Sequence, residues 1–212
     1  MPARRGGRAA DPRRPGLLLR PRRAARPDRR GRDPPAPGPP RPPSRAGPAA
    51  GQPRRRVLVE AQTADLLVRE GLEGRVERLE PGGQVDLDPV LVRPVGKQHA
   101  VIHPWVERIG NTGVVLEAEG APVLFHPGDA LDAEPGPVDV LAVPVNAPWG
   151  KVAETLQFVR RIAPRRGVVP IHDGLLNDTG RSMYLGHVAD FGADGGVEVL
   201  DLRGAGATTL GR

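Results

Sequence analysis

The sequence predicts an α/β domain, a β-sheet covered by helices, that follows a basic N-terminal segment. Two observations lead to this prediction. The composition changes abruptly at residue 57, and beyond it short apolar strands come first in pairs and then in alternation with helical patterns. In addition, residues 138–143 form an almost continuous apolar run. Such a run is typical of a strand that is covered on both faces.

The basic character of the chain comes from its first part alone. Residues 1–56 hold 17 of the 31 basic residues and three acidic ones, which gives a net charge of +14, whereas residues 57–212 have a net charge of −8. The first part also contains 14 prolines and no aromatic residue. Such a segment buries too little apolar surface to offset its conformational entropy. We therefore expect a disordered Arg/Pro-rich segment over residues 1–56 and one domain over residues 57–212.

Periodicity and turn residues define the expected elements of the second part. Apolar residues at helical spacing, with Thr63 as a plausible N-cap of the first helix, favour helices over residues 62–70, 152–162 and 181–191. Short apolar or alternating runs bounded by turn residues favour strands over residues 57–59, 76–79, 85–87, 90–95, 113–117, 122–125, 138–143, 167–171 and 197–202.

Histidines follow several of these strands. All five histidines lie after residue 56, at positions His99, His103, His126, His172 and His187. In a sheet-based domain, the ends of neighbouring strands bring such side chains to one open edge. Histidine and carboxylate are zinc ligands, at about 2.0–2.2 Å, and a carboxylate that bridges two ions suits a two-metal site.

Three stretches of this sequence resemble the metal-binding motifs of metallo-β-lactamase-fold hydrolases. They are GKQHAVIHP over residues 96–104, FHPGDA over residues 125–130 and VPIHD over residues 169–173. The resemblance implies that His99, Asp129 and His172 are metal ligands, with Asp129 as the bridging aspartate. It also implies one or two divalent ions, zinc in type, and a small-molecule substrate.

The resemblance covers residues 57–202 and implies an incomplete αββα sandwich. In complete relatives, further strands and a His-x-His-x-Asp-His motif would precede Val57, and this chain has no such motif. Around the three ligands we expect His103, His126, Asp173, Asn146 and Trp149 to lie in an outer shell or in the substrate pocket. Asp173 is the expected outer hydrogen-bond partner of a ligand. His187 lies in a predicted helix and is interpreted as structural.

The implied reaction is hydrolysis of an ester, a lactone or a phosphodiester by metal-activated water. The aspartate of the missing motif would orient that water in relatives, so we expect weak zinc binding and impaired hydrolysis. The chain has no cysteine, which excludes a cysteine nucleophile and thiolate zinc sites and fits a cytoplasmic protein. No apolar run is long enough for a membrane span.

Two interpretations of residues 1–56 stay open. As a genuine Arg-rich arm, they would bind nucleic acid phosphates without sequence specificity, and the chain would then be a non-catalytic binding protein. As an out-of-frame translation, they would come from a GC-rich gene, since Arg, Pro, Ala and Gly make up 47 of the 56 residues. Residues 34–42 can be encoded so that a shifted frame reads His-Gln-His-Pro-Asp-His-Leu-Asp, which is the missing motif.

Overall fold

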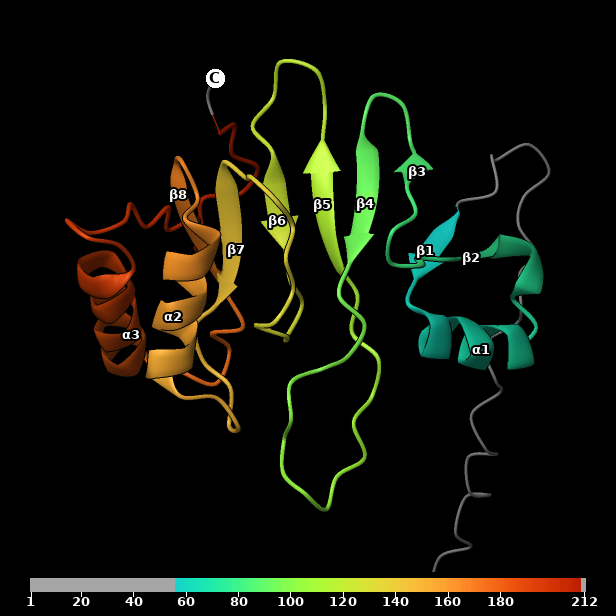
Figure 1. Cartoon of the computed structure of the whole chain (residues 1–212), viewed down its shortest axis with the longest axis horizontal. Coiled ribbons are helices and arrows are strands. Elements are labelled where there is room, and N and C mark those ends of the chain that lie inside the picture. The colour runs from blue at the N-terminus through green and yellow to red at the C-terminus, as the bar shows by residue number, and fades with distance from the viewer. Residues whose placement is uncertain (1–55, 211–212) are drawn as a thin grey trace, which may run out of the picture. The chain divides into compact units, whose positions relative to one another are not determined.

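A six-stranded sheet forms the centre of residues 56–210, the part of the chain that the computed structural model describes (Figure 1). The strands lie side by side in chain order, antiparallel from β3 to β6 and parallel from β6 to β8. They are β3 (Val85–Asp86), β4 (Leu91–Val95), β5 (Gly113–Glu117), β6 (Leu124–His126), β7 (Val140–Pro144) and β8 (Gly167–Ile171).

A small parallel pair of strands precedes this sheet. β1 (Val57–Val59) pairs with β2 (Val76–Arg78), and the connection contains α1 (Ala61–Arg69) and the short 3₁₀ helix η1 (Glu73–Arg75). The N-cap of α1 is Glu60 and not the predicted Thr63, because the Glu60 carboxylate accepts hydrogen bonds from the backbone N–H groups of Gln62 and Thr63. Burial raises the pKa of the Glu60 carboxyl, but the combined effect of these hydrogen bonds is larger and opposite. The pKa of Glu60 therefore lies below its ordinary value.

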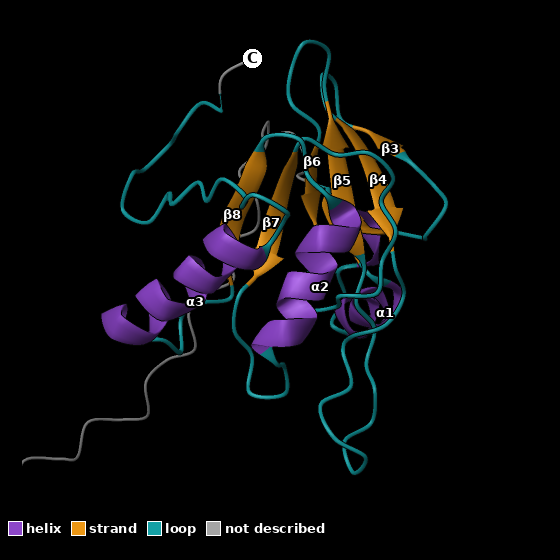
Figure 2. Cartoon of the chain, turned by 60° about the vertical axis from the view of Figure 1, so that its left-hand side comes forward, coloured by secondary structure: helices purple, strands orange, loops and turns teal. Residues whose placement is uncertain are grey.

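Two helices cover one face of the sheet, as Figure 2 shows. They are α2 (Val152–Ile162) and α3 (Asp178–Phe191). The Asn177 side chain caps α3 by accepting from the backbone N–H of Gly180 at 2.8 Å. Side chains from the strands and from both helices form the interior: Val115, Phe125, Leu141, Val143, Phe158, Val159, Ile162, Val168 and Val188. The exclusion of their apolar surface from water is the main stabilising contribution to this domain.

The opposite face of the sheet is less completely covered. Leu116 pairs with Leu124, and Leu124 pairs with Val140, so these three side chains share that face. Val140 is buried, whereas Leu116 and Leu124 are only half-buried. The alternation in burial along β5 and β6 thus separates a fully packed helical face from a partly open one.

The structure confirms the predicted α/β fold class and most of its elements. β5, α2 and β8 have the predicted bounds, and β7 is buried over its whole length. The prediction of a strand over residues 197–202 was wrong. Val199 makes one isolated parallel bridge to Val168, and the chain then turns away so that the Asp201 carboxylate reaches Arg181.

Several expectations lie outside the described residues. The predictions that residues 1–56 are disordered, bind nucleic acid or come from an out-of-frame translation concern a segment of which the structure describes only Arg56. Among residues 56–210, no helix is long and apolar enough to cross a membrane.

Candidate metal centre

The three predicted ligands meet at one edge of the sheet. His99 follows β4, Asp129 follows β6 and His172 follows β8. Each histidine faces a different oxygen of the same carboxylate, with His99 Nε2 at 3.1 Å from Asp129 Oδ2 and His172 Nε2 at 3.6 Å from Asp129 Oδ1. The side chains of His99, His172 and Asp129 are 9%, 27% and 34% exposed, so the carboxylate is reached from solvent while both imidazoles are largely enclosed.

Backbone carbonyls orient both imidazoles. His99 Nδ1 lies 2.7 Å from the Ala100 carbonyl oxygen, and His172 Nδ1 hydrogen-bonds to the carbonyl oxygen of Asn146. A carbonyl oxygen only accepts, so each Nδ1 carries the hydrogen, and in the neutral ring the lone pair is on Nε2. A lone pair that faces a carboxylate is repulsive unless a cation or a second proton lies between them. A cation placed between each ring and the carboxylate would remove this repulsion.

The distances fit metal ligands that share an ion. Two ligands bound tetrahedrally at about 2.0–2.2 Å lie roughly 3.3–3.5 Å apart, close to the two observed nitrogen–oxygen separations. Asp129 thus divides the edge into two half-sites, one with His99 and one with His172. Within residues 56–210 no group of three or more histidine, aspartate or glutamate side chains converges on a single point. Each half-site thus offers two protein ligands, fewer than the three of a catalytic zinc site.

A glycine turn and an asparagine hold Asp129 in place. Gly128 has a positive φ of 69°, and a Cβ there would lie 2.1 Å from Asn111 Oδ1. Asn111 Oδ1 accepts from the Asp129 backbone N–H at 3.0 Å, and Asn111 Nδ2 donates to the Pro127 carbonyl at 2.8 Å. Glycine is required because only it combines this φ with this close approach. The sequence places Asn111 in a loop near this edge, but it does not predict these hydrogen bonds, since no local signal links Asn111 to Asp129, 18 residues further on.

His172 itself has an unusual backbone conformation. Its φ of 59° lies in the left-handed region, which costs a residue with a Cβ roughly 1–2 kcal/mol. Such a conformation persists only where the surroundings hold it, and it is frequent at functional sites. Here it turns the imidazole from the end of β8 toward Asp129.

The outer partners of His172 differ from those expected. The Asn146 backbone, and not the Asp173 carboxylate, accepts from His172 Nδ1. The Asp173 carboxylate accepts from Arg181 Nε at 2.6 Å, and the same guanidinium donates two hydrogen bonds to Asp201. The hydrogen bonds from Arg181, with that from the backbone N–H of Arg203, lower the pKa of Asp201 to about 2, and the two carboxylates raise the pKa of Arg181.

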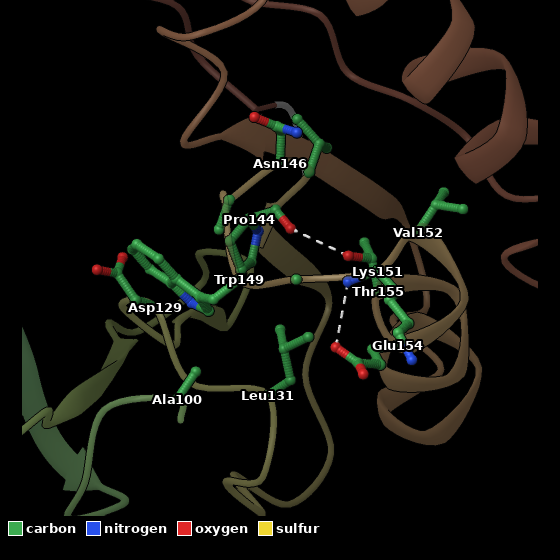
Figure 3. A pocket seen from close by; sticks show the side chains of 13 residues that line it. Ala100, Asp129, Leu131, Pro144, Asn146, Trp149, Lys151, Val152, Glu154 and Thr155 are labelled. Atoms are coloured by element: carbon green, nitrogen blue, oxygen red, sulfur yellow. Dashed lines mark hydrogen bonds between the residues drawn. The ribbon is translucent and has the colours of Figure 1, made fainter. Parts of the chain in front are cut away.

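Trp149 forms the wall of a pocket beside the ligands. Its ring centroid lies 5.0 Å from that of His99 and 5.9 Å from that of His172. Figure 3 shows Asp129, Leu131, Asn146 and Trp149 around a small hollow of about 40 Å³. A wider groove of about 530 Å³ continues from it along α2, because the two share Ala100, Leu131, Trp149 and Glu154.

The other histidines lie apart from the carboxylate of Asp129. His126 is exposed, and its Nδ1 accepts from the backbone N–H of Gly128 at 3.1 Å, so it contacts the turn that carries Asp129. His103 is exposed in the loop after His99, where its ring lies 5.8 Å from that of Trp105, which is 92% exposed. His187 lies on α3, 5.9 Å from the Phe191 ring.

The fold and this edge define a class of protein, an α/β domain with a candidate divalent-metal centre at the ends of its sheet strands. The chain belongs to the beta-lactamase superfamily, since residues 33–172 match the family described as Beta-lactamase superfamily domain. The matched range begins ahead of Val57 and ends at His172, the last of the three candidate ligands.

Parts of the chain are similar to other proteins. Over 110 residues the chain is 39% identical to Protein Rv0786c of Mycobacterium tuberculosis, a match that covers 51% of each protein, so it spans about half the length of that relative. Isothiocyanate hydrolase from Delia radicum gut bacteria has a TM-score of 0.46 at 14% identity, over 69% of this chain and 65% of that one. A possible metal-dependent hydrolase from Veillonella parvula has a TM-score of 0.44 at 14% identity, over 66% and 64%.

Proposed function

We propose that this chain is a metal-dependent hydrolase domain by descent, which binds zinc weakly and hydrolyses esters, lactones or phosphodiesters poorly or not at all. The observation that supports it best is the single carboxylate of Asp129, which offers one oxygen to His99 and the other to His172. This is the arrangement that a bridging ligand between two ions requires.

The residues present fit a divalent ion but provide few ligands for it. His99, His172 and Asp129 would hold it, and Trp149 and Leu131 would place an apolar substrate group beside it. When bound, zinc supplies a water of lowered pKa and polarises the scissile group. Among residues 56–210 no group of three or more histidine, aspartate or glutamate side chains is arranged to hold one ion, so the described residues would supply at most two such ligands to each ion. Weak binding and impaired hydrolysis follow.

Calorimetric zinc titration of the full chain tests this proposal. We expect heat of binding from the unaltered protein and from His187→Ala, whose histidine lies on α3 away from the carboxylate. His172→Ala should lose most of the affinity. Equal affinity in His172→Ala and His187→Ala would contradict the assignment of the site.

A parallel assay tests the impairment. Zinc-loaded protein is incubated with a generic carboxylic ester and a generic phosphodiester, and release of product is compared with zinc alone. We expect no turnover above the zinc control. Stoichiometric zinc together with sustained turnover that is lost in Asp129→Asn would show that the described ligands suffice for catalysis and would overturn the proposed impairment.

A further inference from the structure

The best-enclosed charged side chain of the described domain is a guanidinium one turn inside α3. The Arg181 side chain is 9% exposed, and Nε donates to Asp173 Oδ2 at 2.6 Å while Nη1 and Nη2 donate to the two Asp201 oxygens at 2.6 and 2.8 Å. A buried charge is tolerated only when it is paired and hydrogen-bonded. The fork of Arg181 is paired on both of its sides, so its orientation is fixed.

These hydrogen bonds connect three segments of the chain. Arg181 belongs to α3, Asp173 follows the candidate ligand His172 directly, and Asp201 lies two residues after Val199, which forms a parallel bridge to Val168 of β8. Asp201 holds one edge of the guanidinium in a two-bond contact. The Nε–H on the other edge of the guanidinium therefore has a fixed direction, and it points at Asp173, the residue after His172.

The conformation of His172 makes this contact important. The left-handed backbone of His172 needs support on both sides, because a relaxed conformation would turn the imidazole elsewhere. On the preceding side, the Ile171 carbonyl accepts from the Val145 N–H at 3.1 Å. On the following side, the Asp173 carbonyl accepts from the Leu176 N–H at 3.0 Å, and the Asp173 side chain is bound by Arg181.

We propose that Arg181 is a positioning residue for the metal centre, acting through Asp173 to hold the His172 imidazole toward Asp129. The inference rests on the proposed metal-binding function. Arg181 touches neither Asp129 nor the His172 ring in its hydrogen bonds, so its effect passes through the backbone of residues 172–173. The His99 half-site, on the strand end after β4, does not depend on it.

Two variants and one matched control test the proposal. Asp173→Ala removes the link but leaves the Arg181–Asp201 pair, and Arg181→Lys keeps one charge that cannot reach both carboxylates in the geometry of a fork. Val188→Ala is the control, since Val188 is a fully buried residue of the same helix that packs in the apolar interior and takes no part in the hydrogen bonds of the three charged groups. It lowers stability without touching the link.

Zinc affinity and hydrogen exchange are measured on the full chain. Asp173→Ala and Arg181→Lys should each weaken zinc binding by about 10- to 100-fold, the usual effect of removing an outer partner of a ligand. Both should also speed amide exchange at residues 172–177 in the metal-free protein. Val188→Ala should leave zinc affinity within about twofold of the unaltered chain, whatever its stability.

The outcomes separate this proposal from the proposed function. Unchanged zinc affinity in Asp173→Ala, with normal binding by the unaltered chain, overturns the role of Arg181. If the unaltered chain binds no zinc, the proposed function fails, and exchange in the metal-free protein still decides the positioning role. Faster exchange at residues 172–177 in both variants but not in Val188→Ala then supports it, and equal exchange overturns it.

Discussion

The interior beneath α2 and α3 and the edge that carries His99, Asp129 and His172 are built on opposite principles. In the interior, Phe125, Leu141 and Phe158 are at most 1% exposed and belong to one cluster of apolar side chains, with the Arg161 guanidinium 5.3 Å from the centroid of the Phe158 ring. At the edge, nitrogen and oxygen atoms face each other across 3.1 and 3.6 Å. The interior is stabilised by its own contacts, whereas under the proposed function the edge would be completed by an added cation. Stability and metal affinity should therefore be separable by substitution.

The largest effect is expected in the interior. Phe158→Ala removes a fully buried aromatic ring that packs 6.4 Å from the Phe125 ring, and it should lower the free energy of unfolding by about 3–5 kcal/mol. Urea denaturation followed by circular dichroism measures this loss. Ile162→Val on the same helix is the milder variant, with an expected loss of about 0.5–1.5 kcal/mol, in case the alanine variant fails to fold. Losses near zero in both would mean that the helices do not close a core.

The next effect is expected at the edge, on affinity rather than stability. Asp129→Asn keeps the shape of the side chain but removes the charge that both half-sites share, and zinc affinity should fall by at least about 100-fold. Asp132→Asn makes the same change at a carboxylate that is 64% exposed and contacts only Arg108 at 3.4 Å. Calorimetry should show near-normal zinc affinity in that control. A similar loss in both variants would indicate general electrostatics and not a ligand.

A pair of glycine variants sharpens the comparison. Gly128 and Gly136 both have positive φ, at 69° and 81°, but a Cβ at Gly128 would meet Asn111, whereas a Cβ at Gly136 would meet no non-neighbouring atom of residues 56–210 within 4 Å. Gly136→Ala should cost about 1 kcal/mol from its backbone conformation alone. Gly128→Ala should cost about 2 kcal/mol or more, and it should weaken zinc binding because Asn111 must move. Equal losses measured by urea denaturation would show that the Asn111 contact is unimportant.

The smallest effect is expected on the stability of the fold at acidic pH. The hydrogen bonds from Arg181 lower the pKa of folded Asp201 to about 2, below the value of about 3.9 expected in the unfolded chain. Its stabilising contribution is therefore complete above about pH 4 and is lost as the pH falls toward 2. Asp201 is 43% exposed, so the contribution should stay below about 1 kcal/mol. Asp201→Asn should show a shallower loss of stability between pH 4 and pH 2 in urea titrations, and an unchanged slope would contradict this.

The fold was predictable from sequence wherever local pattern and tertiary packing agree. The spacing of apolar residues in α2 and the strand patterns of β5 and β8 gave correct bounds, because the same side chains that define the pattern also form the interior. The segment over residues 197–202 has a strand-like pattern too, but its ladder stops after one bridge. A long-range ion pair, Asp201 to Arg181, decides its path, and no local pattern encodes it.

The sequence predicted the candidate ligands of the centre better than the residues that hold those ligands in place. His99, Asp129 and His172 follow apolar strands of one sheet. The pairing of the strands brings their ends to the same edge, independently of the length of the loops between them. Asn111 accepts a hydrogen bond from the backbone of Asp129, 18 residues later in the chain, and Arg181 donates one to the side chain of Asp173, 8 residues earlier. Such contacts depend on the fold being formed, so a sequence alone does not reveal them.

The placement of the tryptophans has a practical consequence. The chain contains only two, and one of them, Trp105, is 92% exposed at the loop beyond His99, while Trp149 lies against the His99 and His172 rings. In Trp105→Phe, selective excitation of tryptophan, which avoids Tyr184, gives emission from Trp149 alone, beside the candidate centre. The chain thereby carries its own optical probe, and occupancy of the edge can be followed without any label.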